Sequence, residues 1–269
     1  MHRIRLLVTT FLVALIVAAC ATSPTGRKQM IWANEAELEA EASQAFAQMK
    51  ASTPLMTDRA TIDYIACVAN AIVAELPPPY DTLNWEMAIF DQDAINAFAM
   101  PGGKIGVFKG ILRAAENQDQ LAAVIGHEIA HVPARHSAER ASRAVTQGVG
   151  IQVAAVLLGA GHSGATYTAY QGLDALSEFG IMLPFNRGQE SEADIIGLEY
   201  MARAGFDPRQ SVPLWQNMSR ENKGQKPPEF LSTHPSDETR IDQLVSQFGT
   251  SLKLYNEALN AGKQPNCTR

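Results

Sequence analysis

The spacing of apolar positions changes along the chain and separates helical segments from extended ones. In segment 61–75, apolar residues stand three or four positions apart, which places them on one face of an α-helix. Short apolar runs at 85–90, 95–100 and 104–108 are separated by Asp, Pro and Gly residues, and they predict strands. Other helices are predicted where a capping residue or a stop signal flanks the segment: 34–50, 117–131, 188–204, the stretch after Asp207, and 235–249.

Segment 145–161 is apolar and rich in glycine, so its pattern is ambiguous. Gln147, Gln152 and four glycines interrupt it, and the uninterrupted apolar stretch is short for a membrane span. We interpret the segment as a buried or pocket-lining helix. A membrane-contacting hairpin is the alternative.

The first twenty residues have the pattern of a targeting segment. A basic start, Met1 to Arg5, is followed by the apolar run Leu6–Ala19 and then by Cys20. As a helix this run rises about 21 Å, which is too short for a hydrocarbon core of about 30 Å. We therefore predict a signal peptide over residues 1–19.

The residues Val17-Ala18-Ala19 before Cys20 resemble the lipobox of bacterial lipoproteins. The resemblance implies acylation of the Cys20 thiol and cleavage before it, and several acyl chains give lasting membrane attachment. An uncleaved anchor with an ordinary cysteine is the alternative. Ala21 stands where an Asp is associated with inner-membrane retention. We therefore expect an outer-membrane lipoprotein that faces the periplasm, if the organism has an outer membrane.

Composition sets the class of the remaining chain. Of its 269 residues, 46% are hydrophobic, which is enough for a packed core and excludes a disordered chain. The formal net charge is −6 and no Lys- or Arg-rich block stands out, so nucleic acid is not an expected partner. We divide the chain into the signal peptide 1–19, a lipidated N-terminus and linker over 20–33, and a single domain over 34–269.

If Cys20 is acylated, two cysteines remain, Cys67 and Cys267. An even pair suits an oxidising compartment. Cys67 lies off the apolar stripe of the predicted helix 61–75, so it is not an obvious core residue. We hypothesise a disulfide between these cysteines that ties the C-terminal tail to the helix. Two free thiols are the alternative.

The central chemistry lies in the segment His127-Glu128-Ile129-Ala130-His131, which reads H-E-x-x-H on the predicted helix 117–131. Residues i and i+4 share one helix face, so both imidazoles can reach one metal ion. Glu128 lies about 100° around the helix and can reach a water molecule on that ion without binding it. The alternative is a solvated face with two histidines. The apolar run Leu121–Ile125 argues against it, because it predicts a buried helix, and buried histidines need partners.

A catalytic zinc site has three protein ligands and one open position, so two histidines are incomplete. His136, five residues after the second histidine, lies about 140° around the helix and points elsewhere. Glu190 and Asp194 share one face of the predicted helix 188–204, whereas Glu192 points away. One of the two carboxylates on the shared face can bind the metal while the other orients a histidine.

Four sequence blocks, in this order, resemble the zinc metallopeptidase family of HtpX, BepA, LoiP and the CAAX prenyl proteases, which is peptidase family forty-eight of the metallo class. The blocks span more than half of the chain, and the lipobox and Thr25-Gly26-Arg27 make it most similar to the small lipoprotein members such as LoiP. The blocks are Asn96-Ala97-Phe98-Ala99-Met100-Pro101-Gly102-Gly103, His127–His131 with Arg135-His136, Glu190–Gly197 (E-x-x-A-D-x-x-G), and His234-Pro235 with Arg240 (H-P-x-x-x-x-R).

The resemblance implies an α+β fold, a mostly helical zincin-like (gluzincin) metalloprotease domain around a small β-sheet. It implies that His127, His131 and Glu190 bind one Zn²⁺ ion per chain. Glu128 would accept the proton of the attacking water and pass it to the leaving amine. Asp194 would hold a histidine ligand from behind.

The remaining implied roles surround this centre. His234 would stabilise the oxyanion or occupy the open metal position in a latent state. Arg240 would stabilise the site or its loop, and Glu192 would be only a solvated helix residue. An edge strand facing the cleft would pair with the extended backbone of a substrate, and it would consist of Asn96, Ala97, Phe98 and Ala99.

Pro133 departs from the pattern of the family. Proline removes one backbone N–H group, and its ring here would clash with the carbonyl of Ile129. We therefore expect the helix to kink just past His131.

These inferences predict a zinc-dependent metalloendopeptidase of the bacterial cell envelope. By resemblance, its substrates are misfolded or misassembled periplasmic and outer-membrane proteins, and its partners include the outer-membrane assembly machinery. One alternative is a zinc-bound, chaperone-like holdase or latent pseudo-protease that grips unfolded chains without cutting them. Another is a structural envelope lipoprotein whose metal only braces the fold.

Overall fold

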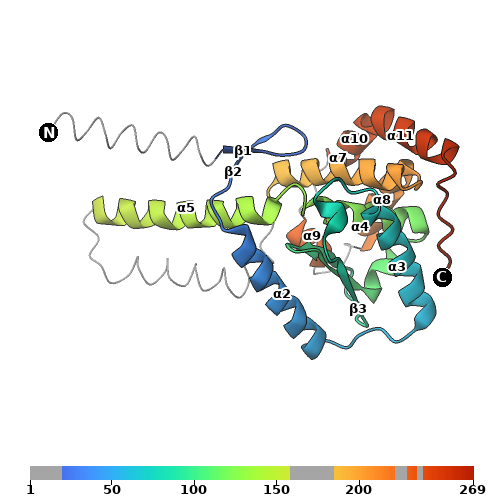
Figure 1. The fold of residues 1–269 in the computed structure, drawn as a ribbon, viewed down its shortest axis with the longest axis horizontal. Helices are drawn as coiled ribbons and strands as arrows, with labels where there is room; N and C mark the ends of the chain where they lie inside the picture. The colour runs from blue at the N-terminus through green and yellow to red at the C-terminus, as the bar shows by residue number, and fades with distance from the viewer. Residues whose placement is uncertain (1–19, 158–184, 222–228, 235–238) are drawn as a thin grey trace.

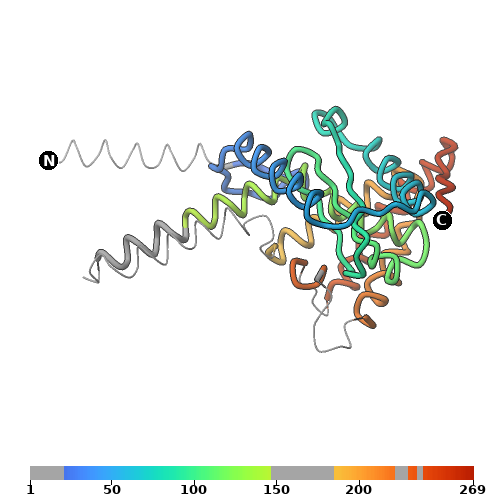
Figure 2. The backbone as a smooth tube through the Cα atoms, turned by 90° about the horizontal axis from the view of Figure 1, so that it is seen from below, coloured from blue at the N-terminus to red at the C-terminus, as the bar shows by residue number. Residues whose placement is uncertain are grey.

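The computed structural model describes residues 20–157, 185–221, 229–234 and 239–269. Helices surround a small sheet, and α5 (His136–Leu157) projects away from the body (Figures 1 and 2). This confirms the predicted α+β class. Within the described residues, we find no helix with the length and apolar character that a membrane crossing requires. The predicted signal peptide 1–19 lies outside the described residues.

The main sheet has three strands in the order β3 (Glu86–Phe90), β5 (Lys104–Phe108) and β4 (Ala97–Met100). All three predicted strands are confirmed, with starts shifted by no more than two residues. β3 pairs parallel with β5, and β4 pairs antiparallel with it. β4 is therefore an outer strand. The turn between β4 and β5 uses Gly102 and Gly103 at φ values of 73° and 75°, which other residues rarely adopt.

Each face of the sheet packs against helices because apolar side chains alternate along the strands. On one face, α2 (Glu35–Ser52) adds Phe46 to an aromatic cluster with Phe90, Phe98 and Phe108. The other face contributes to the main core, which also contains α3 (Arg59–Val73), α4 (Gln118–Ala130) and α7 (Arg187–Arg203). The remaining helices that cover this core are α8 (Ser211–Glu221), α9 (Glu229–Thr233), α10 (Arg240–Ser246) and α11 (Phe248–Asn260).

Helices α4 and α7 approach so closely that each needs a glycine at the crossing. A Cβ atom on Gly197 would lie 2.8 Å from the backbone nitrogen of His127. A Cβ on Gly126 would lie 3.0 Å from the carbonyl oxygen of Gly197. The first turns of these helices are capped by Asn117 and Asn186, whose side chains accept hydrogen bonds from backbone amides.

Three predictions of local structure are wrong. Residues 20–33 are not a linker throughout, because β1 (Cys20–Thr22) and β2 (Lys28–Met30) form an antiparallel hairpin. The predicted helix 235–249 is not the last one, because α10 ends at Ser246 and a further helix, α11, begins at Phe248. Gly249 lies inside α11, without the left-handed φ that ends a helix. The helix 117–131 breaks instead of kinking: α4 ends at Ala130, and Arg135 has a φ of 55° before α5 begins.

The structure joins Cys67 in α3 to Cys267 in the C-terminal tail by a disulfide, across 200 residues of sequence. The apolar segment 145–161 is helical as far as Leu157, and its last four residues lie outside the described part. Val145 in this helix is 45% exposed, so the helix is not buried at that position.

Candidate active site

Helix α4 presents His127, Glu128 and its C-cap residue His131 from one buried stretch. The two histidines lie four residues apart, so they project from one side of the helix as the spacing predicts. Their Nε2 atoms are 3.2 Å apart, and each residue is no more than 3% exposed. Nitrogen atoms this close and this buried need either a shared proton or a cation between them.

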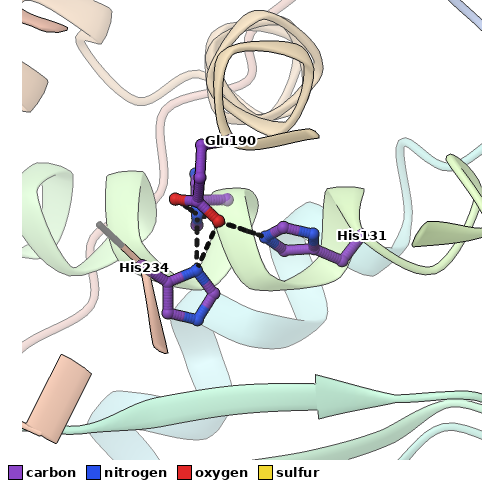
Figure 3. Close-up of side chains that lie close together, drawn as sticks. His131, Glu190 and His234 are labelled. Carbon is purple, nitrogen blue, oxygen red and sulfur yellow. Dashed lines mark hydrogen bonds and ion pairs between the residues drawn. The ribbon is translucent and has the colours of Figure 1, made fainter. Parts of the chain in front are cut away.

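Glu190 and His234 complete the group from two other elements. Figure 3 shows Glu190 pointing from α7 toward the imidazoles of His131 and His234. Its carboxylate oxygens lie 3.0 Å from Nδ1 of His234 and 3.4 Å from Nε2 of His127. One ligand atom from each of these four buried residues lies within 4.8 Å of the others. Three imidazoles and one carboxylate form a donor set that suits zinc.

The electrostatics of the group favour a cation. Burial alone raises the pKa of Glu190, but the neighbouring His234 and His127 outweigh it and hold that pKa well below its usual range. Burial likewise lowers the pKa of His127, yet Glu190 and Asp194 reverse the effect and raise it to about 9. The carboxylate of Glu190 therefore stays ionised at neutral pH, as a metal ligand must.

Asp194 and Arg240 lie on the far side of the histidines from the metal-binding group. Asp194 Oδ1 lies 2.9 Å from Nδ1 of His127 and accepts a 2.8 Å hydrogen bond from Arg240. Arg240 also donates to Glu190 at 3.1 Å, and its guanidinium lies 3.5 Å from the ring centre of Trp215. One arginine thus fixes two carboxylates, each directed at a histidine.

Glu128 lies beside the group without joining it. Its Oε1 atom is 3.4 Å from Nε2 of His234 and has no hydrogen-bond partner within the described residues. Burial raises the pKa of Glu128, while the neighbouring His234, His127 and the backbone of Ala99 act in the opposite direction. A buried carboxylate with a free oxygen and a raised pKa has the properties of a general base or acid.

The predicted substrate strand lies next to Glu128. Asn96 and the residues of β4 line a cavity of about 20 Å³ together with Glu128 and His234. The Phe98 side chain packs into the aromatic cluster instead, so this residue offers the cleft mainly its backbone. Beside His131, past the end of β4, lies a larger cavity of about 180 Å³.

Two residues of the site were misjudged from the sequence. Glu192 is not solvated: it is 3% exposed, and its carboxylate contacts His136 and Arg27. His136 is outside the four-residue group, as expected, but its Nδ1 lies 2.8 Å from Nδ1 of His131. The segment Thr25-Gly26-Arg27 could have indicated that Glu192 is buried. If this segment packs against the domain, the charged Arg27 needs an acidic partner there.

Comparison with known proteins gives one consistent family. The model of peptidase family M48 matches residues 59–247, which contain the whole four-residue group. The mitochondrial metalloendopeptidase OMA1 of Schizosaccharomyces pombe is 40% identical over 184 residues, 67% of this chain and 51% of that protein. The beta-barrel assembly-enhancing protease of Yersinia pestis is 34% identical over 199 residues, 72% of this chain and 40% of that protein.

The same-named protease of Escherichia coli K12 is 32% identical over 200 residues, with the same two coverages of 72% and 40%. The chain therefore spans about half or less of the length of these curated relatives. The family model nevertheless covers more than half of this chain and includes the H-E-x-x-H helix, Glu190 and His234. The chain belongs to peptidase family M48.

Proposed function

We propose that this protein is a zinc-dependent metalloendopeptidase of the bacterial cell envelope. The observation that carries the proposal is the buried Glu128, whose Oε1 has no hydrogen-bond partner within the described residues and lies beside the group of His127, His131, Glu190 and His234. A metal site that only braced the fold would have no use for a buried, unsatisfied carboxylate, which is costly to keep.

Different residues would bind the metal ion, transfer the proton and pair with the substrate. His127, His131 and Glu190 would hold the zinc ion, which when bound lowers the pKa of a water molecule and polarises a carbonyl group. Glu128 accepts the proton of the attacking water and passes it to the leaving amine. The outer edge of β4, which has no partner strand within the described residues, pairs with the backbone of an extended substrate, so sequence preference is loose.

We further propose that the protein acts in quality control of periplasmic and outer-membrane proteins, anchored through an acylated Cys20. The lipobox supports the anchor, and a Cys67–Cys267 disulfide suits an oxidising compartment. Relatives named beta-barrel assembly-enhancing protease support an envelope role for a bacterial chain. The similarity to mitochondrial OMA1 proteins is as strong, and it supports metal-dependent endopeptidase activity more generally.

A latent protease or zinc-bound holdase is the second candidate, and one observation favours it. The cavity between β4, Glu128 and His234 measures about 20 Å³, which is room for about one water molecule but not for a peptide residue. Nδ1 of His234 also lies 3.2 Å from Nε2 of His127, where it could take the fourth metal position. Within the described residues, both observations favour a state in which His234 caps the metal-binding group.

The test compares the wild-type protein with Glu128→Gln by zinc content and casein cleavage. We expect the variant to retain about one zinc per chain and to lose at least about 100-fold in cleavage, because general-base catalysis contributes about 10²–10⁴-fold. Glu116→Gln is the matched control, because this glutamate is 60% exposed near the start of α4. Substantial cleavage by Glu128→Gln would contradict the mechanism.

If wild type and Glu128→Gln both bind zinc and neither cleaves casein, the active-protease proposal fails in favour of the latent state or the holdase. His234→Ala then separates these two. Cleavage gained by His234→Ala would identify a protease capped by its own histidine. Capture of unfolded casein without cleavage, in wild type and variant alike, would identify a holdase.

A further inference from the structure

A second polar cluster is buried next to the metal-binding group and takes no part in the chemistry proposed above. Glu139 and Glu192 are each 3% exposed, and His136 is fully buried. Buried carboxylates are costly unless they are paired, so the partners of these groups matter. The cluster combines side chains from the β1–β2 hairpin, α5 and α7: Thr25, Arg27, Gln29, His136, Glu139, Gln189 and Glu192.

Arg27 holds both carboxylates of this cluster. Its two terminal nitrogens donate to Glu139 at 2.8 and 2.7 Å, and its Nε donates to Glu192 at 2.7 Å. The hydroxyl of Thr25 donates to the other oxygen of Glu192. A two-point arginine–carboxylate pair is specific in geometry, so a docked hairpin fixes where the carboxylate of Glu192 points.

From Glu192 the contacts lead directly to His131. Oε2 of Glu192 lies 3.1 Å from Nε2 of His136, and Nδ1 of His136 lies 2.8 Å from Nδ1 of His131. Of two imidazole nitrogens at this distance, one must donate and the other accept. Since His131 turns Nε2 toward Glu190 and His127, its own proton belongs on Nδ1 and is donated to His136. His136 then carries its proton on Nε2 and donates it to Glu192.

We propose that the N-terminal hairpin is part of the active site, with Arg27 as a positioning residue. Arg27 fixes Glu192, and Glu192 acts through His136 to set the tautomer and ring orientation of His131. The inference rests on the proposed metal-binding role of His131. In this inference Glu192 supports His131 through His136, in the way that Asp194 supports His127 directly. The position of Glu192 depends on the hairpin, which lies more than 100 residues away from α5 in the sequence.

The test measures the Zn²⁺ affinity of the metal-free full chain by competition with a chromophoric chelator. The visible spectrum of the Co²⁺-loaded chain reports the geometry of the ligands. We expect Arg27→Ala to weaken Zn²⁺ binding by up to about 10–100-fold, which is the usual effect of removing a direct outer partner of a metal ligand, because Arg27 acts through Glu192 and His136. The Co²⁺ spectrum should change as well. Arg143→Ala is the matched control, because Arg143 contacts the same Glu139 at 3.2 Å but is 50% exposed and does not contact Glu192.

Two variants of His136 test the last step without disturbing the ion pairs of Arg27. In His136→Asn, the side-chain oxygen can replace Nδ1 as the acceptor that faces His131. In His136→Gln, the amide can replace Nε2 beside Glu192, but the acceptor that faces His131 is lost. We expect affinity near the wild-type value for His136→Asn and a loss of about 10-fold or more for His136→Gln.

Wild-type affinity and an unchanged Co²⁺ spectrum in both Arg27→Ala and His136→Gln would overturn the proposal and leave the hairpin a purely structural role. If Arg27→Ala does not fold, the His136 pair decides the matter alone, because equal affinities in the two His136 variants contradict the positioning role. Failure of the proposed function is a separate result. If the wild-type chain binds zinc but does not cleave casein, the Zn²⁺ affinities of the wild type and of the variants can still be measured and compared.

Discussion

His127 and His131 turn Nε2 toward the metal-binding group and Nδ1 toward other partners. For His127 the partner is the carboxylate of Asp194 at 2.9 Å, and for His131 it is the imidazole of His136 at 2.8 Å. Both arrangements place a hydrogen-bond acceptor behind the ligand, which holds the ring and its tautomer. The position of His136 depends on the ion pairs of Arg27 with Glu192 and Glu139. The docking of the hairpin is therefore expected to depend on pH.

Glu139 makes the docking of the hairpin sensitive to acid. Burial raises the pKa of Glu139, but hydrogen bonds from Arg27 outweigh it, and the pKa lies below its ordinary value. A group whose pKa is depressed on folding contributes stability above its unfolded pKa of about 4.3, and this contribution is lost as the pH falls toward the folded value. We expect the free energy of unfolding to fall more steeply below about pH 4.5 in wild type than in Glu139→Gln.

Urea unfolding between pH 7 and pH 3.5, followed by tryptophan fluorescence, measures this difference. Glu257→Gln is the control, because Glu257 is 60% exposed and its ion pair with Lys253 is long, at 4.0 Å. Parallel pH dependences in wild type and Glu139→Gln would contradict the prediction.

At the scale of elements, the crossing of α4 and α7 determines whether Glu190 and Asp194 reach the histidines. The crossing is close because Gly126 and Gly197 face each other. Three residues of α7 precede this glycine in the same buried segment and carry the acidic groups: Glu190, Glu192 and Asp194. The sheet adds the other wall of the cleft through β4, which packs against α4.

Gly197→Ala should therefore destabilise the protein and its metal site together. The new Cβ would lie 2.8–2.9 Å from backbone atoms of α4, so the helices must separate. We expect a loss of about 1–3 kcal/mol in the free energy of unfolding, the usual cost of overpacking, with weaker Zn²⁺ binding. Gly249→Ala is the matched control, because nothing lies within 4 Å of its Cβ position in α11. Equal stabilities of these two variants, measured by urea unfolding, would contradict the prediction.

At the scale of the whole molecule, both ends of the described chain are attached to the domain. The hairpin is held through Arg27 and Gln29, and the tail is held through Cys267, whose backbone nitrogen also donates to Gln118 at the start of α4. The disulfide closes a loop of 200 residues between α3 and this tail. A crosslink over a long loop reduces the entropy of the unfolded chain.

Replacing both cysteines, in Cys67→Ser with Cys267→Ser, should lower the free energy of unfolding by about 2–5 kcal/mol. Denaturation without reductant measures the loss. A reducing agent should shift the wild-type transition in the same direction and leave the double variant unchanged. A wild-type transition that is insensitive to reductant would sink the idea that this bond stabilises the fold.

The sequence alone determined the local features of this protein. The i, i+4 spacing puts His127 and His131 on one side of a helix whatever surrounds it, and Asn117 starts that helix through its own side chain. Helices and strands followed from periodicity because each depends on neighbours a few residues away. The missed helix α11 shows the limit, since Gly249 permits a stop without requiring one.

Only the tertiary structure decided which charged groups are buried and what holds them. Helix α7 is covered on two faces, so Glu190 and Asp194 face α4 while Glu192 meets the hairpin. Arg27 and Glu192 lie 165 residues apart in the sequence, and no local periodicity encodes such a contact. The physical reason is that pairing a buried charge depends on packing of distant segments, whereas helix formation depends on residues within one or two turns.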